Sequence, residues 1–397
     1  MSRAAVSITK CPDYDLDRVR ASLRETLDGL PGMDDLVSAG DLVVLKPNLL
    51  SSHHGPDAAI NTHPAVVRAT AEWFRERDCR VVIGDSCGSV APGATRRAFE
   101  LTQLVPVAEA TGAEFHDFDR GPHVVLEIPN GKVLDRLRVP KIVRDADLLV
   151  TLPKLKTHSL TMFTGAVKNQ FGLVPGRGKK DIHIRAPKPR MLAQALVDIH
   201  SVAAPNLAIM DGIVGMEGRG PSAGRPRPIG VLLAGTDCVA VDAVAADIIG
   251  FAPGDVDSTA LADASGLGVG TLDRIEVRGA ALSEVHVPDF AKPPQGITGA
   301  FFAVVPSGLI RWGINVLGTE RPDILEERCT VCGECAANCP AGALRRDSGR
   351  IVLDQAKCIG CHCCAEVCKE HAIEMRRPFL GRILRRAYRF AARTPRE

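Results

Sequence analysis

The chain has 397 residues, of which 45% are hydrophobic and 24% are charged, so it is long enough for two or three domains and too apolar to be mainly disordered. Its formal net charge of +2 and its aromatic content of 4% argue against a nucleic-acid-binding surface. The N-terminus lacks the apolar core of a secretory signal, and no stretch of about 18 residues is continuously apolar, so we expect a cytoplasmic protein.

Short aliphatic runs in the first 290 residues predict strands that are buried on both faces. The five runs are 41–46, 80–84, 147–152, 207–210 and 229–234. Between them, residues 64–77, 188–202 and 238–249 have helical patterns. This alternation predicts an α/β fold for residues 1–290, with a mostly parallel sheet and flanking helices.

Polar residues follow each of the five predicted strands. In chain order they are Lys46 and Asn48, then Asp85, then Lys154, Lys156 and His158, then Asp211, and finally Asp237. Ligands of open α/β sheets bind outside the carboxyl ends of the strands, so these residues predict one polar rim. Each aspartate could instead cap a helix. Lysines close together on a loop are typical of an anion site, although a solvated loop would look the same.

Two further segments carry polar residues among small or apolar ones. Residues 161–176 hold Lys168, which either extends to solvent or lies in a pocket, and the neighbouring Asn169. Residues 211–227 are rich in Gly and Arg and include Glu217 and Arg219. Successive small residues let backbone N–H groups approach an anion. Neither segment matches a Walker A motif or a dinucleotide-binding fingerprint.

A cysteine-rich module is predicted at residues 323–375, where nine of the 13 cysteines lie between Cys329 and Cys368. The spacing C-x2-C-x2-C-x3-C occurs twice, with an offset of 29 residues, which indicates an internal duplication. Zinc ribbons use pairs of C-x2-C and fit this spacing poorly. Two [4Fe–4S] clusters fit it well, and electron transfer is the role expected of them, with a purely structural role as the alternative.

The module resembles the bacterial two-cluster ferredoxin domain, in which the fourth cysteine of each run binds the cluster of the other half. This resemblance implies one cluster on Cys329, Cys332, Cys335 and Cys368, and another on Cys358, Cys361, Cys364 and Cys339. Two departures are Lys369, where a second proline is common, and the additional Cys363.

Residues 291–322 are predicted to be a linker, and residues 376–397 an arginine-rich amphipathic tail. Such a tail could contact a lipid surface or an acidic partner, or dock on the protein's own cluster module.

The strings VLKPN, GDS, LPKLKTHSLTMFTGAVKNQFG and DGIVGMEGRGPSAG in the first 280 residues resemble the DUF362 family, a domain of unknown function. Members often carry a C-terminal two-cluster ferredoxin module. The resemblance supports the residues reached by position and adds Asp242. Cys87 in GDSCG departs from the small residue or proline expected there, and a buried structural cysteine is the simpler interpretation.

These patterns predict an iron–sulfur oxidoreductase that passes low-potential electrons to a small anionic substrate and reduces an unsaturated bond. An external donor, such as a ferredoxin, a flavodoxin or a flavoprotein reductase, would supply the electrons. The expected catalytic residues are Lys156, His158, Lys168, Asp211 and Asp85, and the expected substrate-binding residues are Lys46, Asn48, Lys154, Asn169, Glu217 and Arg219.

Three alternatives stay open from the sequence. The chain could be an electron-transfer subunit that docks on a flavoprotein or reductase. It could be a non-redox lyase or isomerase whose clusters sense oxygen. His63 and His158 could also form a second metal site with Asp85 or Asp211.

Overall fold

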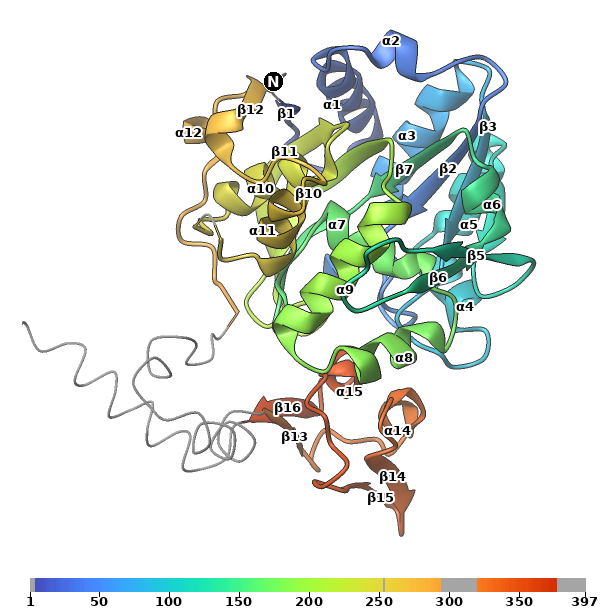
Figure 1. The fold of residues 1–397 in the computed structure, drawn as a ribbon, viewed down its shortest axis with the longest axis vertical. Coiled ribbons are helices and arrows are strands. Elements are labelled where there is room, and N and C mark those ends of the chain that lie inside the picture. The colour runs from blue at the N-terminus through green and yellow to red at the C-terminus, as the bar shows by residue number, and fades with distance from the viewer. Residues whose placement is uncertain (1–3, 253, 294–319, 377–397) are drawn as a thin grey trace, which may run out of the picture. The chain divides into compact units, whose positions relative to one another are not determined.

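The computed structural model describes residues 4–252, 254–293 and 320–376. It divides into two compact units, Met1–Pro293 and Pro294–Glu397 (Figure 1). Most of the predicted linker and nearly all of the arginine-rich tail lie outside the described residues. None of the described helices has the length and apolar character needed to span a membrane.

The first unit is built on a ten-stranded sheet with the order β12-β1-β11-β10-β7-β2-β3-β4, in which β8 also pairs with β10 and β9 pairs with β8. Most neighbouring pairs are parallel, and β11 is antiparallel to both β1 and β10. The strands are β1 (Ala4–Lys10), β2 (Leu42–Pro47), β3 (Arg80–Asp85), β4 (Glu114–Asp117), β7 (Leu148–Leu152), β8 (Lys154–His158), β9 (Met162–Thr164), β10 (Leu207–Glu217), β11 (Arg225–Gly235) and β12 (Ile275–Gly279).

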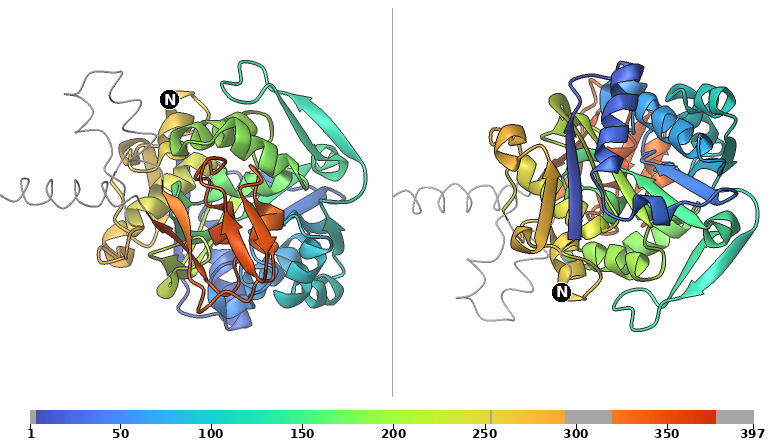
Figure 2. Two further views of the ribbon diagram at one scale, coloured as in Figure 1. Left: turned by 90° about the horizontal axis from the view of Figure 1, so that it is seen from below. Right: turned by 90° about the horizontal axis from the view of Figure 1, so that it is seen from above.

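Helices cover both faces of this sheet, so the predicted α/β class is confirmed (Figure 1). They are α1 (Leu16–Asp28), α2 (Met33–Leu36), α3 (Pro64–Arg75), α4 (Ala94–Leu101), α5 (Leu104–Thr111), α6 (Lys141–Asp145), α7 (Ala166–Asn169), α8 (Gly178–Arg185), α9 (Pro189–Val202), α10 (Cys238–Ile248), α11 (Asp257–Ala264) and α12 (Leu282–Val285). Three short 3₁₀ helices are η1 (Pro56–Ala58), η2 (Gln170–Leu173) and η3 (Leu272–Arg274). A separate hairpin of β5 (His123–Glu127) and β6 (Arg136–Pro140) projects from one side of the unit (Figure 2).

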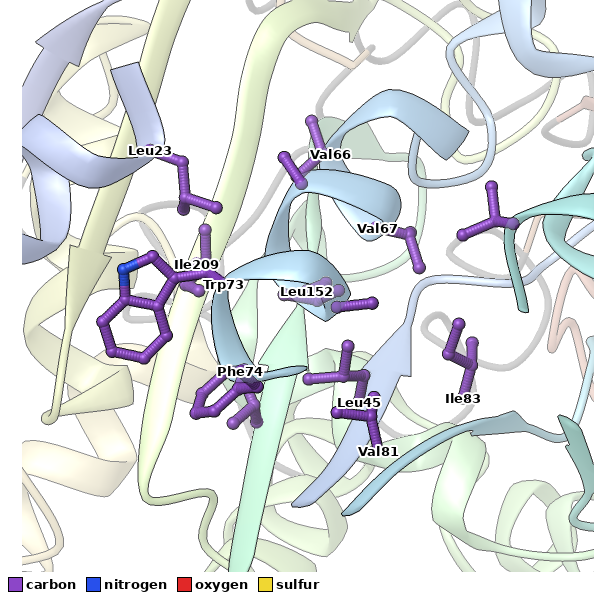
Figure 3. Packing of buried hydrophobic residues seen from close by; sticks show 14 of the residues in the cluster. Leu23, Leu45, Val66, Val67, Trp73, Phe74, Val81, Ile83, Leu152 and Ile209 are labelled. Atoms are coloured by element: carbon purple, nitrogen blue, oxygen red, sulfur yellow. The ribbon is translucent and has the colours of Figure 1, made fainter. Parts of the chain in front are cut away.

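The packing of α3 against the sheet illustrates how the sequence builds this layer. His63 precedes the helix and its Nδ1 accepts a hydrogen bond from the N–H of Ala65, while Pro64 occupies the first helical position, where no N–H is needed. The helix then buries Trp73 and Phe74 in a core with Leu45 of β2 (Figure 3). Aliphatic residues from α1, α3, β2 and β3 fill the same layer, and this packing holds the ends of the central strands in place.

The second unit repeats one short pattern. Its elements are β13 (Arg321–Ile324), α14 (Glu334–Asn338), β14 (Leu344–Asp347), β15 (Arg350–Leu353), α15 (Cys363–Glu366) and β16 (Ile373–Arg376). Strand β13 pairs with β16, and β14 pairs with β15, in both cases antiparallel. The short helices α14 and α15 occupy equivalent positions in the two halves of the sequence duplication.

Two expectations about the elements are wrong. Residues 154–158 form strand β8, buried along its length, and not a loop. The prediction that the polar residues after all five strands form one rim is also wrong for the fifth strand, β11. Because β11 runs antiparallel to β10, Asp237 lies at the opposite end of the sheet from Asp211, where it caps α10 by accepting hydrogen bonds from Val239 N and Ala240 N.

Candidate functional site

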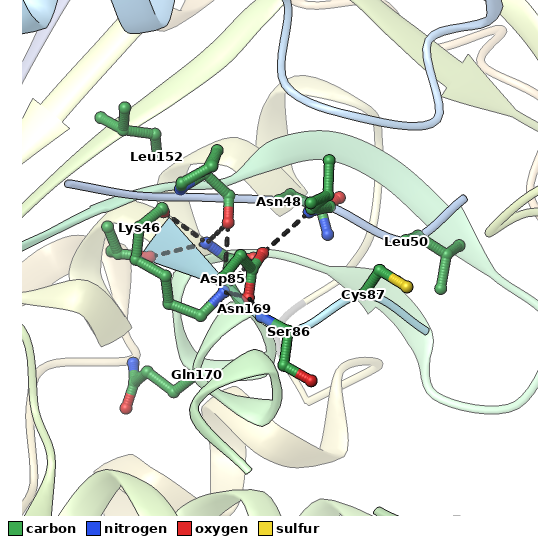
Figure 4. Close-up of polar contacts among 12 residues, drawn as sticks. Lys46, Asn48, Leu50, Asp85, Ser86, Cys87, Leu152, Asn169 and Gln170 are labelled. Atoms are coloured by element: carbon green, nitrogen blue, oxygen red, sulfur yellow. Dashed lines mark hydrogen bonds and ion pairs between the residues drawn. The ribbon is translucent and has the colours of Figure 1, made fainter. Parts of the chain in front are cut away.

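A buried ion pair joins the ends of two adjacent parallel strands. Lys46 at the end of β2 and Asp85 at the end of β3 lie 2.9 Å apart, from Nζ to Oδ1, with exposed side-chain fractions of 1% and 2% (Figure 4). Burial raises the pKa of the Asp85 carboxyl and lowers that of the Lys46 ammonium, and their mutual attraction opposes both shifts. Each charge is therefore buried where it would be strongly unfavourable without its partner.

The hydrogen bonds around this pair use the full capacity of the lysine. Besides Asp85, Lys46 Nζ donates to the carbonyl of Pro47 at 3.1 Å and to Asn169 Oδ1 at 3.4 Å. The Asp85 carboxylate accepts from Leu49 N and Ser86 N at 3.0 and 2.8 Å. An ammonium has three N–H groups, so Lys46 is saturated by the protein itself.

The chain comes unusually close to this pair at Gly172 in η2. A β-carbon at this position would lie 2.1 Å from Asp85 Oδ1 and 2.5 Å from Lys46 Nζ. Glycine is therefore required for the segment after Asn169 to close over the ion pair.

A further buried lysine in this region, Lys179 of α8, was not predicted from the sequence. It is buried, and its Nζ donates to Ser86 O at 2.7 Å, Ser86 Oγ at 2.5 Å and Cys87 O at 2.8 Å. Ser86 Oγ in turn donates to Asp119 at 2.5 Å. The run GRGKKD resembles a solvated charged turn, so the only available signal was its position shortly after the Lys168–Asn169 segment.

A second buried ion pair lies on the neighbouring strands β8 and β10. Lys154 Nζ is 2.8 Å from Asp211 Oδ2, and both side chains are at most 1% exposed. Tyr14, from the segment between β1 and α1, completes the group: its hydroxyl accepts from Lys154 at 2.6 Å and donates to Asp211 Oδ1 at 2.9 Å. Burial lowers the pKa of Lys154, and the attraction of Asp211 opposes this shift.

Strand β8 presents its polar residues on one face. Lys154, Lys156 and His158 are separated by two positions each, so they project from the same side of the strand, and all three are buried. Lys156 Nζ donates to the carbonyl of Ile60 at 2.6 Å. His158 Nδ1 accepts from the N–H groups of Leu160 and Thr161, which turns the chain towards β9.

The segment between β2 and α3 links the two ion pairs. Near its start, Leu49 N donates to Asp85, and at its end His63 N donates to Asp211 Oδ2 at 3.0 Å. Within the segment, Asn48 N donates to Thr62 Oγ1, and the buried Asn48 Oδ1 has no hydrogen-bond partner among the described residues. The ends of β2 and β3, the strands β8 and β10, this segment and α7 thus bring together the predicted residues Lys46, Asn48, Asp85, Asn169, Lys154, Lys156 and Asp211.

Other predicted residues lie outside this group. Glu217 at the end of β10 pairs with Arg225 at 3.1 Å and accepts from Ala291 N, and Arg219 is exposed in the turn between β10 and β11. Lys168 of α7 is half-buried, with its Nζ 5.8 Å from the ring centre of Phe171. Asp242 of α10 is buried and accepts from Ala166 N and Val167 N at the start of α7.

The hydrogen bonds of His63 and His158, the two histidines considered as metal ligands, leave neither ring suited to bind a metal. In both His63 and His158, Nδ1 accepts a backbone N–H, so a neutral ring carries its proton on Nε2. A metal ligand needs a lone pair on its coordinating nitrogen. Among the described residues of the first unit, no group of three or more His, Cys, Asp or Glu residues is arranged to hold a metal ion.

The second unit contains a hollow whose lining includes four cysteines from both halves of the duplication. They are Cys339 from the first run and Cys358, Cys361 and Cys364 from the second. The remaining four cysteines are neighbours as well. Burial, together with the charges of the nearby Cys368, Cys332 and Cys329 thiolates, raises the pKa of Cys335 to about 11. The donor set and its grouping fit iron–sulfur ligation with exchange of the fourth ligand.

Cys363 is separate from this lining. Its Sγ lies 3.8 Å from the carbonyl oxygen of Cys361, to which it donates a weak hydrogen bond. Cys364, and not Cys363, therefore supplies the third thiol of the second run to the lining of the hollow.

Comparisons with known proteins agree with this division. The family described as "Domain of unknown function (DUF362)" matches residues 43–247, and a "4Fe-4S dicluster domain" matches residues 321–369. A thylakoid-associated protein of Synechocystis sp. is 36% identical over 264 residues, which are 66% of this chain and 80% of the relative. The pyruvate synthase subunit PorD of Methanocaldococcus jannaschii is 32% identical over 78 residues, which are 19% of this chain and 91% of that subunit.

Among solved structures, the lactate racemase apoprotein from Thermoanaerobacterium thermosaccharolyticum aligns with a TM-score of 0.40 and 15% identity, covering 59% of this chain and 54% of its own. The family match spans more than half of the chain, and the Synechocystis relative is covered over most of its length. The chain therefore belongs to the DUF362 family and carries an iron–sulfur domain of the 4Fe-4S dicluster type with a redox role.

Proposed function

We propose that this protein is an iron–sulfur reductase that binds a small carboxylate or similar anion at the Lys154–Asp211 site and reduces an unsaturated bond in it. Two [4Fe–4S] clusters, one on Cys329, Cys332, Cys335 and Cys368 and one on Cys339, Cys358, Cys361 and Cys364, are the cofactors of this proposal. When bound, such clusters carry electrons one at a time. An external ferredoxin, flavodoxin or flavoprotein reductase is the proposed electron donor.

One observation carries the proposal: Lys154, Lys156 and His158 lie on one buried face of β8, where Lys154 pairs with Asp211 at 2.8 Å. Buried lysines are rare unless they are paired or meet an anion. Lys154 has one carboxylate partner, and its hydrogen bonds to Tyr14 and Asp211 account for two of its three N–H groups among the described residues. An anionic ligand would complete this coordination and be held in a region of low dielectric.

The proposed roles follow from these contacts. Reduction of one double bond takes two electrons and two protons, so the site must supply protons as well as hold the substrate. Lys154 would bind the anion, and Lys156 and His158 on the same face of β8 would donate protons. Asp211 would keep Lys154 charged and oriented. Lys168, which lies outside this group and near Phe171, is a further proposed proton donor.

Lys46, Asp85 and Asn169 receive a supporting role in this proposal. The three N–H groups of Lys46 are already used within the protein, so the pair shapes the site by fixing the segment that follows β2. Within this segment, Asn48 Oδ1 and Ser52 Oγ are buried oxygens without a hydrogen-bond partner among the described residues, and the amide oxygen of Asn48 could accept only from a donor group of a ligand.

The test uses full-length protein prepared without air, with iron and sulfide restored and dithionite as reductant. Small unsaturated carboxylates, beginning with crotonate and fumarate, are offered as substrates. We expect Lys156→Gln and His158→Gln to lower turnover about 100-fold or more, in line with the loss of a general acid. Lys132→Gln, which alters an exposed lysine of the β5–β6 turn, is the matched control and keeps full activity. Unchanged turnover in both β8 variants would exclude these residues as proton donors.

The alternative function is that of an electron-transfer subunit, and one observation favours it. The relative that matches this module over 91% of its own length is named as a subunit of pyruvate synthase. If the alternative holds, clusters reduce normally but no carboxylate is turned over, and a stoichiometric partner copurifies. The reductase proposal predicts turnover by the isolated chain with dithionite alone.

A further inference from the structure

His63 occupies a defined place beside the second ion pair. It is the residue before α3, it is half-buried, and its backbone N–H donates to Asp211 Oδ2 at 3.0 Å. Its ring stacks on the ring of Tyr14 with a centroid distance of 3.6 Å and an interplanar angle of 12°. Both the main chain and the side chain of His63 are therefore tied to the group that holds Lys154.

The cap of α3 fixes the tautomer of this ring. Nδ1 accepts from Ala65 N at 3.2 Å, so the neutral imidazole carries its proton on Nε2. Among the described residues, Nε2 has no hydrogen-bond acceptor. Burial and the nearby charge of Lys154, opposed by the attraction of Asp211, lower the pKa of His63 to about 4. The ring is thus neutral at physiological pH and keeps one N–H to offer.

Tyr14 orients the ring but has no hydrogen-bonding capacity left for a ligand. Its hydroxyl donates to Asp211 and accepts from Lys154 and from Val214 N at 3.1 Å, which uses its one proton and both lone pairs. Asp211 is similarly occupied, since it accepts from Tyr14, Lys154, His63 N and Ile213 N. The donors that remain are the third N–H of Lys154 and Nε2–H of His63.

We propose that His63 is a substrate-contacting residue whose Nε2–H donates a hydrogen bond to a carboxylate oxygen of the substrate, beside Lys154, and that Tyr14 is its positioning residue. This inference rests on the proposed function, because it concerns the same anion site. A neutral donor beside a lysine already paired with Asp211 suits a monoanion. A phosphate dianion at the same place would meet the Asp211 carboxylate with little positive charge to balance it.

The binding test needs no reductant, so it is independent of whether the protein turns anything over. Full-length protein with its clusters restored is labelled with ¹⁵N-histidine, and two-bond ¹H–¹⁵N spectra report the tautomer of each ring. His63→Asn assigns the His63 signal and keeps the cap of α3, because asparagine is among the preferred N-cap residues. If this variant does not fold, His63→Gln serves for the assignment.

We expect a neutral Nε2–H tautomer for His63 from pH 8 down to pH 5, and a shift of its Nε2 signal when crotonate is added. At pH 8, where inorganic phosphate is mainly the dianion, the same concentration of phosphate should leave the signal in place. His63→Asn should weaken crotonate binding at least tenfold while the protein still unfolds cooperatively, with a small fall in melting temperature because the stack on Tyr14 is lost. An Nδ1–H tautomer, an imidazolium at pH 7, a phosphate response that equals the crotonate response, or the absence of a crotonate response would overturn the inference.

If crotonate shifts the signal but no carboxylate is ever reduced, the reductase proposal fails while the contact from His63 stands. The converse result, turnover that is unchanged in His63→Asn, removes His63 from the site and leaves the reductase proposal intact.

Discussion

The ammonium of Lys46 and the carboxylate of Asp85 lie 2.9 Å apart at the ends of two parallel strands, where neither reaches solvent. Removing the cation by Lys46→Met leaves a carboxylate buried without its countercharge, so we expect the free energy of unfolding to fall by about 3–5 kcal/mol. Urea denaturation followed by far-UV circular dichroism measures this change. The control Lys132→Met removes an exposed lysine and should alter stability by less than about 0.5 kcal/mol.

The loss of stability caused by Lys46→Met should also depend on pH. Burial already raises the pKa of Asp85, and without Lys46 the rise is larger. A carboxyl whose folded-state pKa is raised destabilises the fold as pH increases through that pKa, because the folded protein then holds a proton that the unfolded chain releases. The deficit relative to the wild type should therefore be smaller at pH 5 than at pH 8. An equal deficit at both values would mean that Asp85 is not the source.

Tyr14→Phe tests whether the tyrosine hydroxyl organises the second ion pair. The substitution keeps a ring to stack on His63 but leaves Lys154, Asp211 and Val214 N each one partner short. We expect stability to fall by about 1–3 kcal/mol, the usual cost of unsatisfied buried polar groups. Tyr14→Leu also removes the stack and should cost about 0.5–1.5 kcal/mol more. Thermal unfolding of both variants separates the hydroxyl from the ring, and a neutral effect of Tyr14→Phe would show that the network reorganises without it.

The regular parts of the fold follow from local signals, whereas the partners in the site do not. The short aliphatic runs of β2, β3 and β7 predict buried strands, and Pro64 marks the start of α3. Strand β8 escaped recognition because its alternate residues, Lys154, Lys156 and His158, are polar, although that alternation is itself a strand pattern in which the polar face is the buried one.

Long-range pairing sets the limit of what could be predicted for the site. Lys46 and Asp85 were expected at one rim, but only the pairing of β2 with β3 makes them direct partners. Tyr14 lies in an irregular segment before α1 with no motif around it, and its role depends on contacts almost 200 residues away. The orientation of β11, which moves Asp237 to the other end of the sheet, likewise depends on sheet topology and not on any local sequence signal.

Asp242 should make the stability of the first unit depend on pH. Burial raises the pKa of its carboxyl to about 7, although Ala166 N and Val167 N donate to it. Because this value is above that of the unfolded chain, the stabilisation is complete below about pH 4 and is lost as pH rises towards 7. Asp242→Asn removes the titration, so its stability relative to the wild type should rise by up to about 4 kcal/mol between pH 4 and pH 8. Denaturant curves at four pH values give the comparison, and parallel pH profiles of the two proteins would refute the assignment.

The grouping of the cysteines predicts which substitutions remove the same cluster. Cys339 comes from the first run but lines the hollow with Cys358, Cys361 and Cys364, so Cys339→Ala and Cys364→Ala should strip one and the same cluster. Each should lower the iron content from about eight to about four atoms per chain, and their dithionite-reduced EPR spectra should match. Cys335→Ala should leave the other cluster, with a different spectrum, because Cys335 groups with Cys368, Cys332 and Cys329. Cys363→Ser is the matched control and should retain the full iron content, since Cys363 does not line the hollow. If Cys339→Ala instead gives the spectrum of Cys335→Ala, each cluster is held within its own run and the exchange of the fourth ligand is wrong.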